Sequence, residues 1–554
     1  MLICGIKLTH DAAVAVMDDE RLLFSMEIEK LNNNARYSAM SSIAQVECIL
    51  RSEGIHPRDI EAFVIDGWKG GRVNAFGMHV APYHQFDGSG GLQPMTPLFH
   101  DGLNIGGSSR AYWSYQHMTT HVIGTYAASP FAARREHAYV ITWDGGQNPR
   151  VSLVNPDAPI PIKHVSSLLG FYGIIYGIMG YYYGPYARPE VANIDIASST
   201  ERFYGGYDKP GKLMSYIGLG AVDAGLLISM ERIYDELVPS AFLLDLGYKQ
   251  NGILEHEFMR RVQRAAGPNV APADALRTVH EFIERKLVAA ARQVIPEGSN
   301  LLFTGGSALN IKWNSALRAS GHFARVWVPP FPNDTGNALG AAAALRADKR
   351  DEWYMDWDPY RGPRLGSLPA AARRERCDVE RLARELAANP ETPIVVLNGR
   401  AEIGPRALGH RSIIAAPTSP KMKALLNELK GREPFRPVAP MCLEERAPEI
   451  FFPGTPDPHM LFDHDVLPNW VDRLPAIMHT DGSARLQTVG TRDGSPFVRQ
   501  LLLAFHRLTG IPVLCNTSAN LNGSGFFPDI DSALAWAQQH GLRVWAEGYF
   551  YSRD

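Results

Sequence analysis

The sequence has few cysteines, and none of them forms a recognisable pair. Five occur among 554 residues, and no Cys-x-x-Cys motif is present. Scattered cysteines of odd number argue against a disulfide framework or a cysteine zinc site, and they fit a reducing cytoplasm. Long apolar runs are also missing, and the N-terminus lacks the basic and long apolar stretches of a signal peptide. We therefore expect a cytoplasmic protein that does not bind a membrane.

Charge of one sign is not in excess either. The formal net charge is −3, and the isoelectric point is about 6.7. Such a balance gives no general attraction to a polyanion, so we expect no nucleic-acid partner, and any phosphate site must be local. A chain of 554 residues is too long for one core, which predicts two or three domains.

The first residues predict an α/β domain. A short apolar strand at 2–7 precedes two strand-like runs, 12–17 and 22–28, with an acidic turn between them. Apolar residues at helical spacing follow at 41–52, and another strand is predicted at 62–65. Actin-like ATPase domains begin in this order. The Gly-, Pro-, His- and aromatic-rich stretch 67–110 is interpreted as a long insertion that faces the substrate.

A domain boundary is predicted at about 350–380, where residues 353–369 are rich in Pro, Asp and Arg. Arginines are then dense from 373 to 449. We expect a first domain at 1–355, a linker at 356–380 and a second domain at 381–554.

Two histidines and two aspartates predict a metal site. His117 and His121 are four apart, so on a helix they share one face and can reach one ion. Asp144 follows the predicted strand 139–143, and Asp334 lies in a Pro- and Asn-rich loop. Two imidazoles and two carboxylates suit iron, manganese or zinc. The alternative is two polar residues on an ordinary helix face.

Glycine-bearing turns after strands predict a phosphate site. Gly145 and Gly146 follow Asp144, and Gly305 and Gly306 precede Asn310. Glycine lets the backbone approach phosphate and point its N–H groups at it. A small-residue helix opening at 336–341 adds a helix N-terminus, which also favours anions. Ordinary turns are the alternative interpretation.

His10, followed by Asp11, comes directly after the first predicted strand. A histidine there can act as general base near a hydroxyl acceptor. A turn histidine beside a capping aspartate explains the same residues equally well.

The last third carries guanidinium, amide and hydroxyl groups in turns. Arginine beside Gly and Pro suits bidentate binding of phosphate and carboxylate-like oxygens. Surface salt bridges, which stabilise little, are the alternative. The candidate residues lie in the segments 398–412, 430–437 and 515–523 and at position 485: Arg406, Lys430, Arg436, Arg485, Ser518 and Asn520.

In combination, these motifs resemble the O-carbamoyltransferase family (the NodU/CmcH type), which includes the tobramycin, cephalosporin and nodulation-factor enzymes. The similarity is most specific in 399–412, 432–437 and 516–520. It implies a duplicated actin-like (ASKHA) domain with the metal pattern of the tRNA threonylcarbamoyl-transferase fold, followed by a YrdC-like α/β domain. Residues 211–220 depart from the family's Gly-Lys-Val-Met-Gly-Leu-Ala, which leaves the nucleotide contacts there open.

The resemblance implies a two-step reaction. Carbamoyl phosphate and ATP, with Mg²⁺, give carbamoyl adenylate in the YrdC-like domain, and a hydroxyl acceptor then attacks it in the actin-like domain. Iron (Fe²⁺) is the metal that the family implies, although another divalent ion fits the same ligands. His10 matches the family's acceptor-side histidine. The positions that match carbamoyl phosphate and nucleotide contacts are Arg406, Lys430, Arg436, Arg485 and Ser518.

Three rival functions are a tRNA threonylcarbamoyl-type transferase, an actin-like kinase and a non-catalytic metal-binding scaffold. The lack of basic excess opposes the first, and the arginine-rich C-terminal third is unexplained by the second. The acceptor is expected to be a natural product with a free hydroxyl, such as a macrolide, an ansamycin or a glycoside. The aromatic run 168–186 fits either an apolar acceptor or core packing. The oligomeric state stays open, with a homodimer among the options.

Overall fold

A computed structural model describes residues 1–73, 76–83, 93–194, 206–238, 248–366 and 372–553. The chain forms two compact units, one from residues 1–134 with 329–554 and the other from residues 135–328. Both combine sheets and helices, so the predicted α/β class is confirmed. Within the described ranges, no helix is long and apolar enough to span a bilayer.

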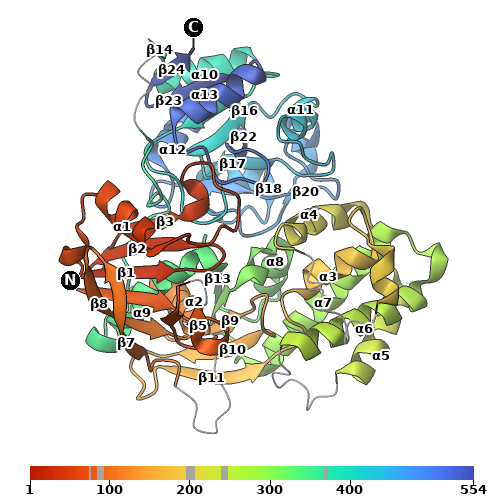
Figure 1. Cartoon of the computed structure of the whole chain (residues 1–554). Coiled ribbons are helices and arrows are strands. Elements are labelled where there is room, and N and C mark those ends of the chain that lie inside the picture. The colour runs from red at the N-terminus through yellow and green to blue at the C-terminus, as the bar shows by residue number, and fades with distance from the viewer. Residues whose placement is uncertain (74–75, 84–92, 195–205, 239–247, 367–371, 554) are drawn as a thin grey trace. The chain divides into compact units, whose positions relative to one another are not determined.

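The first unit begins with a six-stranded mixed sheet in the order β3-β2-β1-β4-β8-β7 (Figure 1). Its central strand β1 is antiparallel to β2 and parallel to β4, which is parallel to β8. The strands are β1 (Leu2–Lys7), β2 (Ala13–Asp18), β3 (Arg21–Glu27), β4 (Ala62–Asp66), β7 (Leu98–Ile105) and β8 (Ser108–Tyr115). The predicted opening strands, acidic turn and helix α1 (Ile43–Ser52) are therefore confirmed.

The stretch 67–110 is only partly an insertion. Strand β7 pairs antiparallel with β8 and so continues the first sheet, and at its end the buried Leu103 and Ile105 alternate with the exposed Asn104. The short strands β5 (Arg72–Val73) and β6 (Met78–His79) form a separate ribbon. Residues 74–75 and 84–92 lie outside the described part of the chain.

Helix α9 (Asn337–Arg350) packs closely on β1 and on helix α2 (His117–Ala128) (Figure 1). A methyl group on Gly5 would lie 1.9 Å from the carbonyl oxygen of Ala338, and one on Gly340 would lie 2.1 Å from that of Thr120. Such approach requires residues without a side chain, which explains the small-residue sequence of α9. This close packing places the start of α9 beside the start of α2.

The second unit contains a five-stranded sheet in the order β11-β10-β9-β12-β13. Its first strand in the chain, β9, is antiparallel to β10 and parallel to β12, which is parallel to β13. This repeats the order and directions around β1 in the first unit. The strands are β9 (Ala138–Thr142), β10 (Arg150–Val154), β11 (Ile162–Ser167), β12 (Asn300–Thr304) and β13 (Arg325–Trp327).

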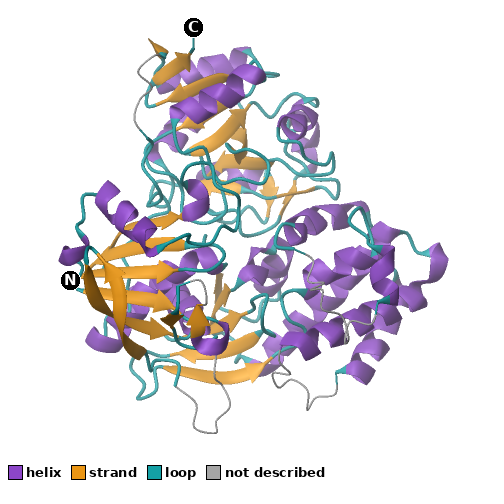
Figure 2. Cartoon of the chain, viewed as in Figure 1, coloured by secondary structure: helices purple, strands orange, loops and turns teal. Residues whose placement is uncertain are grey.

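The rest of the second unit is mainly helical (Figure 2). Helix α3 carries the middle of the aromatic run 168–186 and is buried along its whole length. The ring of Phe171 lies 4.9 Å from that of Phe258, and the ring of Tyr176 lies 5.3 Å from that of Trp313. These contacts support the core-packing interpretation of the run. The helices are α3 (Ile175–Tyr182), α4 (Lys209–Tyr216), α5 (Ala224–Leu237), α6 (Tyr248–Ala266), α7 (Pro272–Val294) and α8 (Ile311–Ala319).

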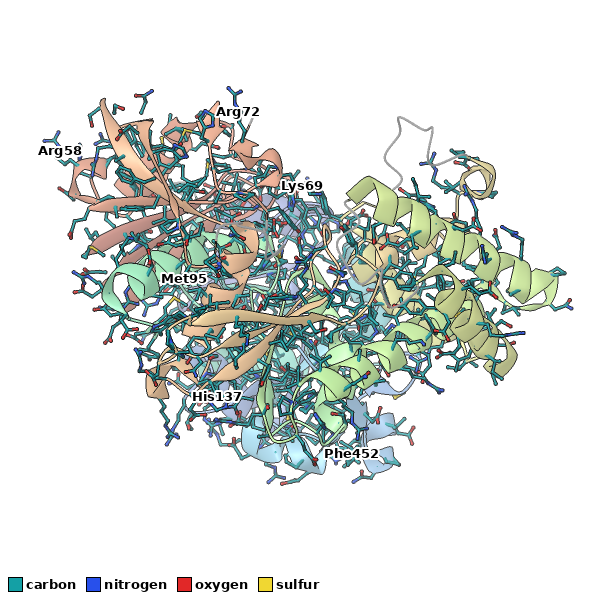
Figure 3. All side chains as sticks on the ribbon, turned by 90° about the horizontal axis from the view of Figure 1, so that it is seen from below. Arg58, Lys69, Arg72, Met95, His137 and Phe452 are labelled. Carbon is teal, nitrogen blue, oxygen red and sulfur yellow. The ribbon has the colours of Figure 1, made fainter. Side chains whose placement is uncertain are left out.

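The C-terminal part of the first unit contains an eight-stranded sheet in the order β14-β24-β23-β15-β16-β22-β17-β21. Its strands are β14 (Arg373–Arg376), β15 (Ile394–Leu397), β16 (Arg411–Ala415), β17 (Ala439–Leu443), β21 (Gln487–Val489), β22 (Val513–Ser518), β23 (Arg543–Ala546) and β24 (Tyr549–Ser552). Helices α10 (Val379–Ala388), α11 (Met422–Leu429), α12 (Pro496–Thr509) and α13 (Ile530–Gln539) accompany it. A small sheet of β18 (Phe451–Phe452), β19 (His464–Val466) and β20 (Ser483–Ala484) presents Phe452, which is 65% exposed (Figure 3).

Buried polar contacts join the two sheets of the first unit. The ammonium of Lys30, which is 1% exposed, donates to Oε1 of Glu27 and to the carbonyl oxygens of Glu402 and Gly404 at 2.6–2.8 Å. Arg400 binds both carboxylate oxygens of Glu53 at 3.0 and 3.1 Å. The arginine-rich segment that begins at residue 398 is therefore held against the N-terminal sheet.

We expect Gly340→Ala to lower the free energy of unfolding by about 1–3 kcal/mol, because the added methyl group overlaps the backbone of α2. Gly211→Ala is the matched control, since Gly211 lies in helix α4 with open space around the added methyl group. Denaturant unfolding of both variants measures the effect. Equal stability of the two variants would contradict the close contact between α9 and α2.

Candidate active site

Three of the four predicted metal ligands come together in the first unit. His117 and His121 lie on the first turns of α2, and Asp334 lies immediately before α9. Oδ1 of Asp334 is 3.4 Å from Nε2 of His117 and 3.3 Å from Nε2 of His121. All three side chains are at most 2% exposed. The close packing of α2 on α9 produces this arrangement.

These three residues fit a metal ion. Nε2 of His121 is buried and makes no hydrogen bond within the described residues. Ligand atoms bound to one ion at about 2.1 Å are separated by roughly 3.0–3.4 Å, depending on its geometry. The separations between Oδ1 of Asp334 and the two imidazole nitrogens agree with that range.

Further buried groups orient the triad. Nδ1 of His117 lies 2.8 Å from Oδ2 of Asp66, which favours a proton on Nδ1 and directs the lone pair of Nε2 toward Asp334. Lys7 forms ion pairs of 3.0 Å with both Asp66 and Asp334. Burial alone would lower the pKa of Lys7, but the two carboxylates raise it above its usual value.

The ammonium of Lys7 also favours the ionised form of Asp334. Burial works against ionisation, but the charges of Lys7, His117 and His10 hold the pKa of Asp334 well below its usual range. The carboxylate is therefore ionised at neutral pH, with Oδ2 toward Lys7 and Oδ1 toward the imidazoles. Neither Lys7 nor Asp66 was among the predicted site residues.

Asp144 and the glycine turns lie in the second unit. Asp144 follows β9, and its Oδ1 accepts a hydrogen bond of 3.2 Å from the backbone N–H of Gly306. Gly305 has φ of 89°, and an added methyl group there would lie 2.4 Å from the carbonyl oxygen of Trp143. The predicted turns at 145–146 and 305–306 are thus brought together. The participation of Asp144 in the metal site stays a prediction.

Asn310 has a structural role. Its side-chain oxygen accepts from the backbone N–H groups of Lys312 and Trp313 and so caps helix α8. Capping satisfies N–H groups that have no partner within the helix. A nucleotide contact of Asn310 stays a prediction.

His10 lies in the turn after β1, on the same side as the histidine–aspartate triad. Its Nδ1 is 3.0 Å from Oδ2 of Asp11, and its Nε2 is 3.6 Å from Oδ2 of Asp334. The side chain is 22% exposed, so solvent or a ligand can reach it. With the proton on Nδ1 bound to Asp11, Nε2 carries the lone pair that a general base needs.

Arginines of the C-terminal part form a buried cluster in which guanidinium groups lower one another's pKa values. Burial, together with the charges of Arg36 and Arg436, lowers the pKa of Arg406 to about 10. Burial and the charges of Arg406 and Arg436 likewise hold the pKa of Arg485 well below its usual value. Nε of Arg406 and Nε of Arg485 are buried and make no hydrogen bond within the described residues.

Arg432 belongs to the same cluster. Burial, together with the charges of Arg436 and Arg485, lowers the pKa of Arg432 to about 9. A guanidinium stays protonated at neutral pH, so these lowered pKa values indicate positive charges that are buried close to one another. Like charges about 4 Å apart repel by about 4 kcal/mol at an effective dielectric constant near 20. An anion would relieve this repulsion.

Lys430 holds the end of β22 beside this cluster. Its ammonium donates to the carbonyl oxygen of Ser518 at 2.6 Å and to both the carbonyl and side-chain oxygens of Asn520. The hydroxyl of Ser518 donates to the side-chain oxygen of Asn520 at 2.7 Å. The three predicted residues are therefore brought together, with Lys430 ordering the turn that carries the other two.

Other arginines of the segment 398–412 have structural partners. Arg411 is 1% exposed and donates to the carbonyl oxygens of Asn398, Gly399 and His410. Arg400 is paired with Glu53. In contrast, Arg36 was not among the predicted site residues; it lies in the loop between β3 and α1, near the cluster. Only its place in a polar turn after a strand could have indicated it.

Comparison with known proteins identifies the family. The model of the carbamoyltransferase N-terminus matches residues 2–92 and 107–343, and that of the carbamoyltransferase C-terminus matches residues 383–553. Nodulation protein U of Sinorhizobium fredii is 42% identical over 576 residues, which cover 100% of this chain and 99% of that protein.

Two more distant similarities differ in strength. The 3'-hydroxymethylcephem-O-carbamoyltransferase of Amycolatopsis lactamdurans is 31% identical over 98% of this chain and 97% of its own length. The solved activator of 2-hydroxyisocaproyl-CoA dehydratase from Clostridium difficile is 15% identical with a TM-score of 0.32, covering 63% of this chain and 96% of that chain, which is too weak to establish a shared fold. The resemblance that the sequence motifs indicated is confirmed by the family models and the full-length relatives. The chain belongs to the carbamoyltransferase family and is an enzyme of that family.

Proposed function

We propose that this carbamoyltransferase makes carbamoyl adenylate from carbamoyl phosphate and ATP, and then transfers the carbamoyl group to a hydroxyl of a small molecule. The observation that carries the first step is the buried arginine cluster around Arg406, Arg432, Arg436 and Arg485, whose guanidinium groups lower one another's pKa values. Both proposed co-substrates are phosphate anions, which guanidinium groups bind bidentately. A nucleic-acid acceptor is not proposed, because the chain has no excess of basic residues.

The first step needs several anionic oxygens to be held together. Carbamoyl phosphate takes up one water and releases phosphate, and an oxygen of the resulting carbamate attacks the α-phosphorus of ATP and displaces pyrophosphate. The negative charge that moves to the leaving pyrophosphate would be stabilised by fixed guanidinium groups. The hydroxyl of Ser518 and the amide of Asn520, which Lys430 orders, offer further polar contacts. Mg²⁺ would accompany ATP.

The second step fits the surroundings of His10. The acceptor oxygen attacks the carbamoyl carbon, the bond to the phosphate oxygen of AMP breaks, and Nε2 of His10 takes the hydroxyl proton. Asp11 would hold the Nδ1 proton, since these atoms are 3.0 Å apart. His117, His121 and Asp334, with Asp144 as the proposed fourth ligand, would hold a divalent ion, with Fe²⁺ as the first choice. When bound, such an ion supplies a Lewis acid for phosphate or carbonyl oxygens.

The repeated strand order of the two units supports a duplicated actin-like domain over residues 1–355. A YrdC-like domain at 381–554, joined by residues 356–380, would then form the adenylate. For the acceptor, the 3'-hydroxymethylcephem named for one relative suggests a primary hydroxyl on a small natural product. An actin-like kinase would instead give ADP and a phosphorylated acceptor. Product analysis distinguishes the two, because the proposed reaction gives AMP and pyrophosphate.

We expect the two steps to separate by residue. Arg436→Ala or Ser518→Ala should reduce pyrophosphate release from ATP and carbamoyl phosphate by about 100-fold or more, since each removes a donor to developing charge. Arg499→Ala is the matched control, because Arg499 is paired with Glu445 at the surface. The measurement is pyrophosphate release without acceptor. Full activity of the Arg436→Ala and Ser518→Ala variants would overturn the arginine cluster as the first site.

His10→Ala should leave that pyrophosphate release intact and lower carbamoyl transfer by about 100- to 10,000-fold, the usual contribution of a general base. The transfer assay is mass spectrometry of candidate hydroxyl compounds after incubation with enzyme, ATP and carbamoyl phosphate. An equal loss of both steps would contradict the division between His10 and the arginines.

We expect about one divalent metal per chain in protein purified without chelator, as a single mononuclear site requires. His121→Ala should lower that ratio strongly, because its buried Nε2 faces Asp334. The exposed His137, labelled in Figure 3, provides the control variant His137→Ala. Elemental analysis of the three proteins is the measurement. Unchanged occupancy in His121→Ala would show that the metal lies elsewhere.

A further inference from the structure

Arg36 lies in the loop between β3 and α1, and its charge acts on the C-terminal arginine cluster. Its charge lowers the pKa values of Arg406, Lys430 and Arg432, after the larger effect of burial. Its own carboxylate partner, Glu29, is at 3.8 Å from its Nε, which is too long for a hydrogen bond. Burial alone would lower the pKa of Arg36, but Tyr37, Glu29 and Asp11 raise it above its usual value, so Arg36 stays charged beside the other guanidinium groups.

Backbone hydrogen bonds fix Arg36 beside the turn that follows β22. The N–H of Arg36 donates to the carbonyl oxygen of Gly523 at 2.9 Å, and the N–H of Gly525 donates to that of Asn34 at 3.0 Å. Ala35 and Ser524 form an antiparallel bridge between them. The side chain of Asn520 donates to the carbonyl oxygen of Ser524 at 2.7 Å, so the turn continues directly from the residues that Lys430 orders.

The same segment is bound at its other end to the turn that carries His10. The N–H of Ala12 donates to the carbonyl oxygen of Ser38, and the N–H of Met40 donates to that of Leu8, both at 3.0 Å. Residues 34–40 thus connect the neighbourhood of Ser518 with the neighbourhood of His10 inside one unit.

The backbone is strained at both ends of this connection. Tyr37 has φ of 63° and Asp11 has φ of 55°. A bulky residue rarely adopts such a conformation, and strained residues of this kind concentrate at ligand sites. At Tyr37 the carboxylate of Glu29 accepts the backbone N–H at 3.1 Å, which helps to hold the conformation. The backbone next to Arg36 is therefore held in one conformation.

We propose that Arg36 is an anion-binding residue of the arginine cluster, and that anion binding there orders residues 34–40 and the His10 turn attached to them. This inference rests on the proposed function, which makes the cluster a phosphate site. The N-terminal part of the chain then supplies a guanidinium to the first step as well as the base of the second. The ligand class is a phosphate or pyrophosphate anion.

Binding of inorganic pyrophosphate to the full-length protein, measured by isothermal titration calorimetry, tests the proposal. Arg36→Gln removes the charge and keeps the backbone contacts, and we expect about 10- to 100-fold weaker binding, the usual effect of losing a charge-assisted hydrogen bond. Arg36→Lys should recover part of the affinity, because it keeps the charge but not the bidentate fork. Arg58→Gln is the control, since Arg58 is exposed and points outward (Figure 3).

Glu29→Gln gives a change of the opposite sign. It removes the carboxylate nearest to Arg36, so binding of pyrophosphate should become tighter or stay equal. Amide hydrogen exchange gives a readout that does not depend on activity. In the wild type, pyrophosphate should slow exchange at residues 8–12 and 34–40, and in Arg36→Gln this protection should be lost while the thermal midpoint is unchanged.

The outcomes separate the two proposals. If Arg485→Gln weakens binding and Arg36→Gln does not, the role of Arg36 is wrong and the phosphate site stands. If the wild type binds no pyrophosphate, or if Arg485→Gln has no effect, the phosphate site itself is wrong, and Arg36 falls with it. If Arg36→Gln weakens binding but exchange at 8–12 is unaffected, the connection to His10 is wrong.

Discussion

The ion pairs of Lys7 organise the histidine side of the first unit. Its buried ammonium is bound to Asp66 and Asp334 together, so both carboxylates stay ionised in a place where burial would otherwise favour their protonation. Asp66 in turn orients His117, and Asp334 faces the two imidazoles. A buried cation that lacked these partners would be costly. The position of every group in this site therefore depends on β1 and α9 lying close together.

The arginine cluster differs from the site of Lys7, because its buried positive charges lie close to one another. Lys7 has two carboxylates within 3.0 Å, whereas Arg406 and Arg485 have a buried Nε that makes no hydrogen bond within the described residues. Repulsion between these charges destabilises the folded state, and contacts elsewhere in the fold offset it. Examples are the hydrogen bonds of Lys30 and Arg400, which hold the segment that begins at residue 398 in place. A folded protein that keeps several buried positive charges close together in this way is preorganised for an anion.

The sequence predicted the elements and many site residues, but not the groups that orient them. Helical spacing placed His117 and His121 on one face, and the strand patterns predicted β1, β9 and β12. Strand β7 was missed, because Gly and Pro around it suggested an insertion. Lys7, Asp66 and Arg36 were also missed. Each acts through residues far away in the chain, and no local pattern distinguishes a buried lysine on a strand from an exposed one.

Under the proposed two-step reaction, the position of Arg36 gives a reason for combining activation and transfer in one chain. A mixed anhydride such as carbamoyl adenylate is hydrolysed if water reaches it before the acceptor does. Residues 34–40 are hydrogen bonded both to the turn after Asn520 and to the turn of His10, so a ligand that orders one end changes the free energy of the other. If binding at one of these two turns strengthens binding at the other, the reverse must hold to the same extent. An acceptor seated near His10 would then strengthen anion binding at the arginines, so that the reactive intermediate forms chiefly when its acceptor is already present.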